Sequence, residues 1–182
     1  MARQRSVGSR APLPPSAFAP LVPVDSLSAA LASFAVWANS TTNRRNLLRS
    51  SGFPIQDDLA AFLVLNQLIY RGAAHPTELA EAVEISTSHI SKIVTRLEDA
   101  GLAVKAPDRH DKRAVVVALT AAGREIGTRI GAEIDTYFEE LFHNWSDEDR
   151  SELSRLVVKL AHSADAASAH ALSRASGYDW SQ

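Results

Sequence analysis

Apolar side chains recur every three to four residues along much of the chain, which is the spacing that buries one face of an α-helix. From Asp25 onward this pattern predicts a helix that ends at the Gly-Phe-Pro break at 52–54. A second helix, begun by Asp57 or Asp58 and ended by Gly72, is apolar on nearly every side. Because such a helix is typically buried, we expect this one in the core.

The stretch from His75 to Thr120 combines helical and strand-like patterns. Pro76 suits the first position of a short helix, because its missing N–H would be unpaired there anyway. After a tight turn, the Ser86 hydroxyl can cap a second helix, which Gly101 ends. The apolar stripe of this second helix is Ile90, Ile93, Val94 and Leu97. The spacing therefore predicts a helix-turn-helix.

Two β-prone runs follow this motif. They span Leu102–Lys105 and Ala114–Thr120, and they flank a polar, basic tip at residues 107–113. This arrangement is typical of a β-hairpin with a charged tip. A helix-turn-helix followed by a basic hairpin predicts a winged helix, and the usual function of a winged helix is the recognition of duplex DNA.

Beyond Thr120 the chain returns to helical spacing, in a long helix and then a final one. The long helix carries Gly123, Gly127 and Gly131 at spacing four, beside its apolar stripe. An interior glycine costs a helix about 1 kcal/mol relative to alanine. We therefore expect the glycine stripe to admit the close approach of another helix; the alternative is that the glycines are simply tolerated.

The terminal helices carry apolar stripes. The winged helix can form its own small core without them, so these stripes remain to be buried elsewhere. Leftover stripes at both ends of a chain pair most economically across a two-fold axis. We therefore predict a homodimer built from the terminal helices. The Ala/Ser-rich residues 166–182 are predicted to form a loose tail; the alternative is that its two aromatics, Tyr178 and Trp180, dock on the rest of the protein.

Composition narrows the class of protein. Of the 182 residues 46% are hydrophobic, and none is cysteine, which excludes disulfides and thiolate metal ligands. No apolar run reaches the about 18 residues of a membrane span, and the N-terminus lacks the apolar core of a signal peptide. The expected location is the cytoplasm.

The chain has a net charge of −2, and only two of its regions have a net positive charge. Residues 1–50 carry six basic side chains against one acidic one, and residues 86–113 carry six against four. Residues 121–182 carry six against eleven. A local basic patch on an otherwise acidic protein favours one docking orientation on DNA.

The layout resembles the MarR (multiple antibiotic resistance regulator) family of transcription factors over roughly residues 25–165. The most specific part is the run Asp-Arg-His-Asp-Lys-Arg at 108–113, followed by an apolar strand, Thr120 and Gly123. This is similar to the family's Asp-x-Arg wing signature and to the Leu-Thr-x-x-Gly that opens the next helix. Glu84 departs from the pattern, since family members often have glycine in this turn, and slight strain is expected there.

The resemblance implies a mainly α (α+β) fold, with a winged helix-turn-helix domain joined to a dimerisation domain of N- and C-terminal helices. It also implies a dimeric repressor, less often an activator, whose affinity for a near-palindromic operator a small ligand changes. The alternative is a winged-helix protein-interaction module without specific DNA binding. We divide the chain into a flexible extension (1–24), an N-terminal dimerisation helix with its connection (25–56), the winged helix (57–120), C-terminal dimerisation helices (121–165) and a tail (166–182).

The polar positions of the second helix of the motif are the candidate DNA contacts, since that helix enters the major groove. They are Ser86, Thr87, Ser88, His89, Ser91, Lys92, Thr95 and Arg96. Ser88, His89 and Lys92 are the preferred base readers, whereas Ser86 and Thr95 are expected in capping and phosphate roles. The alternative is an ordinary solvated helix face.

At the hairpin tip, Arg113 is the sharpest candidate. Asp111 can pair with it and hold its planar guanidinium toward the minor groove, where narrow A·T-rich segments attract arginine. Arg109 and Lys112 would add phosphate contacts. The alternative is a solvated hairpin tip. Similarly, the arginines at positions 3, 5 and 10 can form an arm that touches DNA, or a solvated leader.

Other site types have less support in the sequence. A pocket for a small aromatic anion could be lined by Trp37, Arg44, Arg45, Phe62 and Tyr70, although each also fits a core or surface position. The six histidines form no close pair at metal-ligand spacing, so we expect no metal and no cofactor. Neither a catalytic triad, a phosphate loop nor a carboxylate pair is evident, and an enzyme is not expected.

Overall fold

The computed structural model describes residues 25–109 and 111–180 and divides the chain into two compact units, residues 1–40 and 41–182. The predicted extension 1–24, with its arginines, lies outside the described residues. In the first unit, α1 (Leu27–Ala38) is capped by Ser26, whose hydroxyl accepts a hydrogen bond from the Ala29 N–H at 3.2 Å. None of the α1 side chains is buried.

The chain before the Gly-Phe-Pro break forms two helices where the periodicity predicts one. After α1, Asn39 and Ser40 interrupt the helical run, and α2 spans Thr41–Ser50. The Asn39 side chain donates a hydrogen bond at 2.9 Å to the carbonyl of Ala35, in the last turn of α1. Asparagine and serine side chains compete in this way with helical backbone hydrogen bonds. The spacing of apolar residues does not reveal this competition, so it predicted one continuous helix.

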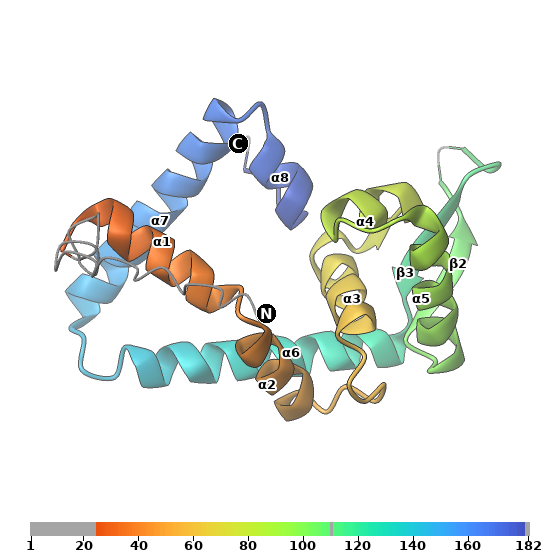
Figure 1. Ribbon diagram of the computed structural model, residues 1–182, viewed down its shortest axis with the longest axis horizontal. Helices are drawn as coiled ribbons and strands as arrows, with labels where there is room; N and C mark the ends of the chain where they lie inside the picture. Colours follow the sequence, from red (N-terminus) through yellow and green to blue (C-terminus); the bar gives the residue numbers. More distant parts are fainter. Residues whose placement is uncertain (1–24, 110, 181–182) are drawn as a thin grey trace, which may run out of the picture. The chain divides into compact units, whose positions relative to one another are not determined.

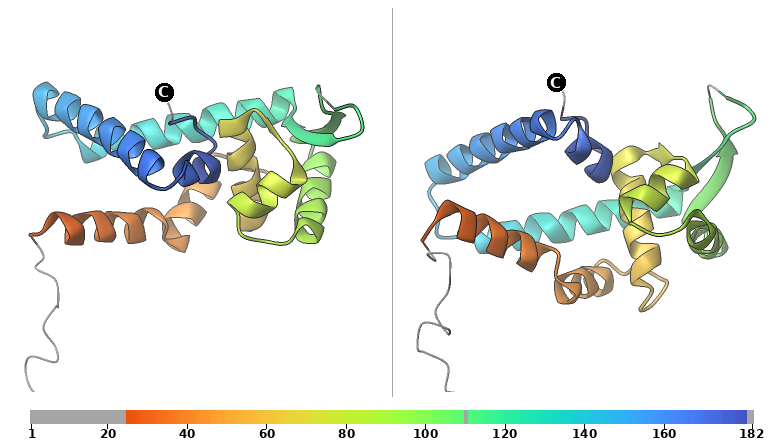
Figure 2. Two further views of the ribbon diagram at one scale, coloured as in Figure 1. Left: turned by 90° about the horizontal axis from the view of Figure 1, so that it is seen from above. Right: turned by 45° about the horizontal axis from the view of Figure 1, so that its top comes forward.

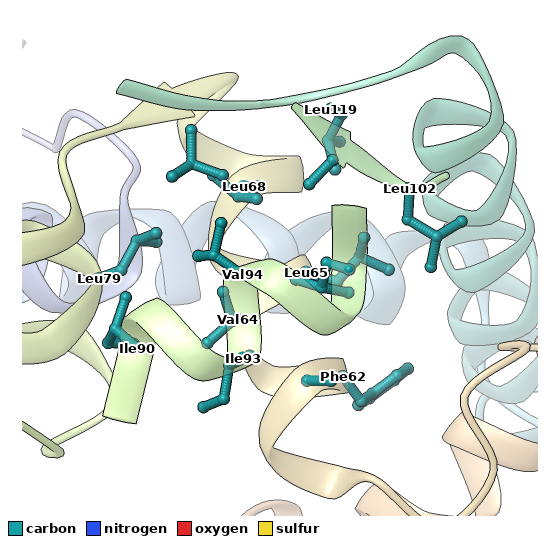
Figure 3. Packing of buried hydrophobic residues seen from close by; sticks show 14 of the residues in the cluster. Phe62, Val64, Leu65, Leu68, Leu79, Ile90, Ile93, Val94, Leu102 and Leu119 are labelled. Carbon is teal, nitrogen blue, oxygen red and sulfur yellow. The ribbon is translucent and has the colours of Figure 1, made fainter. Parts of the chain in front are cut away.

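In the second unit, α3 (Leu59–Arg71), α4 (Pro76–Ala82) and α5 (Thr87–Asp99) contribute to one hydrophobic core (Figures 1 and 3). Asp58 caps α3 by accepting a hydrogen bond from the Ala61 N–H at 3.0 Å, and Gly72, with φ of 75°, follows its last residue. The core position expected for α3 is confirmed. Its buried side chains are Ala61, Phe62, Val64, Leu65 and Leu68.

A three-stranded antiparallel sheet in the order β1-β3-β2 completes the winged helix. β2 (Ala103–Pro107) and β3 (Val115–Leu119) form the predicted hairpin, in register from the pair Ala103–Leu119 to the pair Pro107–Val115. The third strand, β1 (Ala73–Ala74), was not predicted. Two alanines carry no strand signal, because β propensity comes from side chains that pack on a pleated surface.

Two helices of 21 residues each, α6 (Ala121–Leu141) and α7 (Asp147–Ala167), follow the sheet (Figure 2). The glycine stripe of α6 has three different surroundings. A Cβ added at Gly127 would lie 3.0 Å from Ile69 on α3, so a helix does approach closely there, as predicted. At Gly123 the near neighbour is instead the Leu102 backbone, and Gly131 has nothing within 4 Å.

The end of the chain is more regular than its composition indicated. Helix α7 extends to Ala167, and a further short helix, α8 (Ala171–Ser176), follows in place of a loose tail. Alanine is the strongest helix former, so an Ala/Ser-rich segment becomes helical once tertiary contacts hold it. Among the helices of the described residues, none is long and apolar enough to cross a membrane.

Candidate nucleic-acid interface

The helix-turn-helix consists of α4, a short turn and α5. The N–H of His75 donates a hydrogen bond to Glu78 at 2.7 Å, and Pro76 takes the first helical position as predicted. In the turn, Glu84 has φ of +55°, the left-handed conformation that glycine adopts most easily. The strain expected from Glu84 therefore has a structural basis.

The second helix of the motif, α5, has a sharply divided surface. Its predicted stripe, Ile90, Ile93, Val94 and Leu97, is 0–1% exposed and packs in the core (Figure 3). Ser86 caps the helix through the His89 N–H at 3.3 Å, which confirms its predicted capping role. Opposite the stripe the polar side chains of Thr87 to Lys92 face solvent. The helix is thus held rigidly by one face and presents the other.

The exposed polar side chains of α5 differ in how far the protein already engages them. Ser91 and Thr95 each donate a hydroxyl hydrogen bond at 3.0 Å to the carbonyl four residues earlier. Among the described residues no side-chain hydrogen bond or ion pair engages Ser88, His89 or Lys92. These three side chains are therefore open to a ligand without the loss of an internal contact.

Arg96 has a partner within the protein. Its Nε lies 2.6 Å from Asp58 Oδ2, at the start of α3. Burial raises the pKa of the Asp58 carboxyl, but the hydrogen bond and charge of Arg96 and the N–H groups of α3 outweigh it, so the net pKa is lowered. Arg96 thus links α5 to the start of α3, a role that sequence spacing did not indicate.

The hairpin tip is organised by backbone hydrogen bonds to carboxylates. Asp108 accepts the Asp111 N–H at 3.0 Å, and Asp111 accepts the Arg113 N–H at 2.9 Å. Asp111 therefore holds the backbone of Arg113, which differs from the side-chain pair that the sequence predicted. The Arg109, Lys112 and Arg113 side chains are exposed, and no ion pair within the described residues engages them.

His75 connects this hairpin to the helix-turn-helix. Its Nε2 lies 3.3 Å from Asp108 Oδ2, and its Nδ1 lies 3.2 Å from the Val115 carbonyl. The two contacts place the start of α4 against the tip end of the hairpin, where β2 ends and β3 begins. Sequence reasoning missed this residue, because the contacts join positions more than 30 apart and no local spacing signals them.

The five residues predicted to line an anion pocket have separate surroundings. Phe62 is 1% exposed and packs edge-on against Phe53 in the core, with ring centroids 5.5 Å apart. Trp37 belongs to the first unit, where it lies beside Phe34. Tyr70, half-buried, faces Tyr178 near the chain's end. Arg44 and Arg45 lie on α2, and Arg45 is exposed.

No group of three or more histidine, acidic or cysteine side chains within the described residues is placed to hold a metal ion.

A helix-turn-helix with a free polar face on its second helix, beside a hairpin with a cationic tip, defines a winged-helix DNA-binding regulator. The model of the MarR family matches residues 55–114, which span the helix-turn-helix and most of the hairpin. The chain is 30% identical over 103 residues to the HTH-type transcriptional regulator FarR of Neisseria gonorrhoeae, covering 57% of this chain and 70% of that one. The chain belongs to the MarR family, whose members are transcriptional regulators and not enzymes.

Solved structures agree with this fold. A MarR family protein from Bacillus stearothermophilus superposes with a TM-score of 0.60 at 24% identity, over 73% of this chain and 91% of that one. NadR in complex with 4-hydroxyphenylacetate gives a TM-score of 0.52 at 26% identity, over 78% of this chain and 98% of NadR. The mainly helical winged-helix fold expected from the sequence is confirmed.

Proposed function

We propose that the protein is a homodimeric repressor that binds a near-palindromic operator and leaves it when a small ligand binds. The observation that carries the proposal is the open face of α5. Ser88, His89 and Lys92 are exposed, near the helix N-terminus and without side-chain partners in the described residues. Since the opposite face of α5 is locked in the core, these side chains can be inserted into a major groove at small entropic cost.

The other candidates on α5 take supporting roles in this proposal. Thr87 is exposed in the first turn, where hydroxyl and backbone N–H groups suit phosphate. Ser86 accepts a hydrogen bond within the helix and keeps its hydroxyl hydrogen, so it is assigned to a phosphate contact. Ser91 and Thr95 donate their hydroxyls to backbone carbonyls, so each is assigned to a phosphate contact that it makes by rotating its hydroxyl from the carbonyl to a phosphate oxygen. Arg96 is assigned mainly to holding α5 against Asp58.

The hairpin is proposed to enter the neighbouring minor groove. Arg113 is exposed, and its backbone is fixed by Asp111, so the side chain leaves the tip from a defined point. Arg109 and Lys112 add positive charge beside it. A guanidinium is favoured in a narrow minor groove because the negative potential is enhanced there.

Dimerisation is proposed because the terminal helices expose large apolar side chains in runs. A monomeric soluble protein rarely exposes large contiguous apolar patches, so such runs indicate an interface. We assign 25–56 and 121–165 to dimerisation and 57–120 to DNA binding. The exposed side chains are Leu27, Leu31, Phe34, Val36 and Trp37 on α1, Tyr137, Phe138, Leu141 and Trp145 around the end of α6, and Leu156, Val157, Val158 and Leu160 on α7.

The effector is proposed to be a small aromatic anion. The support is the structure of NadR, which was solved with 4-hydroxyphenylacetate bound. Of the five residues first considered for this role, Tyr70 and the α2 arginines stay in the proposal, and Trp37, which belongs to the first unit, is left out of it. Phe62 is withdrawn as a direct contact, because a side chain 1% exposed in the core is not available to a ligand.

A DNA-binding titration on the full chain tests the proposal. Labelled duplex from the region upstream of the protein's own gene is titrated with protein, and fluorescence anisotropy is followed at several salt concentrations. Half-sites about 10 base pairs apart and a steep fall of affinity with salt are expected. Absence of binding at low salt contradicts the proposal and favours the protein-interaction module.

A further inference from the structure

The segment after α7 makes two sets of contacts that the proposed function does not use. We name residues 168–180 the C-terminal strap. It turns back from the end of α7, forms α8, and reaches the ends of α3 and α4 (Figure 2). The strap therefore joins a helix assigned to dimerisation to the helix-turn-helix.

The strap is anchored on α7 by a buried carboxylate. Asp165, fully buried, accepts hydrogen bonds from the Ser173 N–H at 2.7 Å and faces His170 Nδ1 at 2.8 Å. Between them the chain reverses at Ala169 and His170, which both have positive φ. A buried carboxylate would be costly without such partners, so Asp165 fixes the direction in which the strap leaves α7.

The far end of the strap returns to the same helix. The Trp180 N–H donates to the Ser173 hydroxyl at 3.0 Å, and the Trp180 carbonyl lies 2.8 Å from Nδ1 of His162 on α7. The Trp180 ring also meets the His162 ring edge-on, at 5.7 Å between centroids. The strap is thus a closed loop with both ends on α7.

The middle of the strap rests on the end of α3. The Arg71 guanidinium donates a hydrogen bond to the Arg174 carbonyl, and the Tyr178 ring packs against the Tyr70 ring, tilted by 38° with centroids 4.9 Å apart. Gly177 has φ of +84°, and a Cβ there would lie 2.7 Å from the Arg71 side chain. Any other residue at this position is therefore strained and displaces the Arg71 side chain.

The strap leaves the exposed polar face of α5, the proposed DNA-contacting face, uncovered. A depression of about 280 Å³ separates α8 from α4, and its lining comes from α3, α4 and α8. Ser88, His89 and Lys92 on α5 are exposed with the strap in place. The strap therefore does not act by covering the recognition helix.

We propose that the C-terminal strap is an internal tether that fixes the helix-turn-helix relative to α7. Because α7 is assigned to dimerisation, the tether sets the spacing between the winged helices of the two subunits. The inference rests on the proposed DNA-binding function. A lobe already held in one orientation loses less freedom on binding, so the tether raises operator affinity. It also makes the dimer intolerant of half-sites at another spacing.

The test compares operator binding by the full chain with binding by three strap variants. Tyr178→Ala removes the ring that covers Tyr70, and Gly177→Ala introduces a side chain where the backbone and Arg71 oppose it. Tyr178→Phe is the matched control, because it keeps the ring that packs against Tyr70. Tyr178 is 48% exposed, so its loss spares the core. Each protein is titrated with its operator and with a duplex carrying a half-turn insertion of about five base pairs between half-sites.

We expect Tyr178→Ala and Gly177→Ala to bind the operator about tenfold more weakly, within the usual range of coupling between sites. Both should discriminate less than the parent chain against the half-turn insertion, and Tyr178→Phe should match the parent. Unchanged affinity and discrimination, or tighter binding, would overturn the tether.

Hydrogen exchange separates failure of the tether from failure of the proposed function. If the full chain does not bind its upstream DNA, the DNA-binding proposal fails first. The backbone amides of α4 are then compared in the parent chain and Tyr178→Ala without DNA. Faster exchange in the variant supports the tether, and equal exchange overturns it.

Discussion

Asp58 and Arg96 lie 38 residues apart in the chain, yet their side chains meet at 2.6 Å. The aspartate caps α3, and the arginine comes from the helix that is proposed to read DNA. One carboxylate therefore serves a helix terminus and a tertiary contact at once. The pair therefore links the start of α3 to α5 beside their shared hydrophobic core.

Asp58→Asn separates the two roles, since asparagine can still cap α3 but carries no charge. The Arg96 side chain is 40% exposed, so screening limits the pair to about 0.5–1 kcal/mol of stability. Asp58→Ala should lose about 1 kcal/mol more, because the cap also disappears. Urea unfolding of the three proteins measures both steps, and equal midpoints for Asp58→Asn and the parent would contradict a role for the charge.

The same pair gives a pH dependence of defined sign. The folded-state pKa of Asp58 is lowered from the ordinary 3.8, so the native state holds this proton less tightly than the unfolded chain. Its contribution to stability is complete above about pH 4–5 and is lost as the pH falls through the folded-state pKa. The stability difference between the parent and Asp58→Asn should shrink below pH 4. A difference that is constant from pH 6 to pH 3 would exclude this linkage.

Glu84 occupies the turn of the helix-turn-helix with φ of +55°. A side chain in the left-handed region costs about 1–2 kcal/mol, partly offset by the greater freedom of glycine in the unfolded chain. Glu84→Gly should therefore stabilise the protein by about 0.5–1 kcal/mol, measured as a higher urea midpoint. Glu84→Ala, which removes the charge but keeps a Cβ, serves as the control and should show no such gain.

Gly123 and Gly131 lie on the same helix with opposite surroundings. A Cβ at Gly123 would stand 2.0 Å from the Leu102 carbonyl oxygen, whereas Gly131 has nothing within 4 Å. Gly123→Ala should destabilise the protein by about 1–3 kcal/mol through overpacking against backbone. Gly131→Ala should stabilise it by up to about 1 kcal/mol, since alanine is the better helix former. Thermal unfolding of both variants checks the opposite signs, and two shifts of the same sign would contradict this account.

Local rules in the sequence were sufficient for much of this molecule. The spacing of Ile90, Ile93, Val94 and Leu97 predicted the buried face of α5, and Ser86 and Asp58 were recognisable as caps. The glycine stripe of α6 indicated that another segment packs closely against this helix, but it did not indicate which segment. At Gly127 the partner is a helix, and at Gly123 it is the start of the hairpin.

What sequence reasoning missed depends on contacts between distant positions. Nothing near Arg96 indicates that its charge is used by Asp58, so the residue resembled a free cation of the recognition helix. Phe62 is equally suited to a core and to a ligand pocket, and packing against Phe53 decides between them. The strap has a loop-like composition; its two aromatics, Tyr178 and Trp180, indicated that it could dock, but nothing local indicated their partners Tyr70 and His162.

The wing proposal depends on the difference between two cations of the same hairpin. Arg113 lies at the tip, exposed and without an ion pair in the described residues, whereas Lys105 on β2 pairs with Glu98 at 2.6 Å. Arg113→Ala should weaken operator binding by about 1–3 kcal/mol if the side chain makes an ordered minor-groove contact. Lys105→Ala removes the same charge from a residue already engaged and is the matched control.

Fluorescence anisotropy at fixed salt measures both variants, and a salt titration then shows how many phosphate contacts each has lost. Arg113→Ala should lose more affinity for the operator than for unrelated duplex, because a groove contact depends on sequence and shape. Lys105→Ala should leave both affinities nearly unchanged, since its charge is already balanced by Glu98. Equal operator affinity in Arg113→Ala and the parent would remove the wing from the interface and leave α5 as the DNA-contacting element.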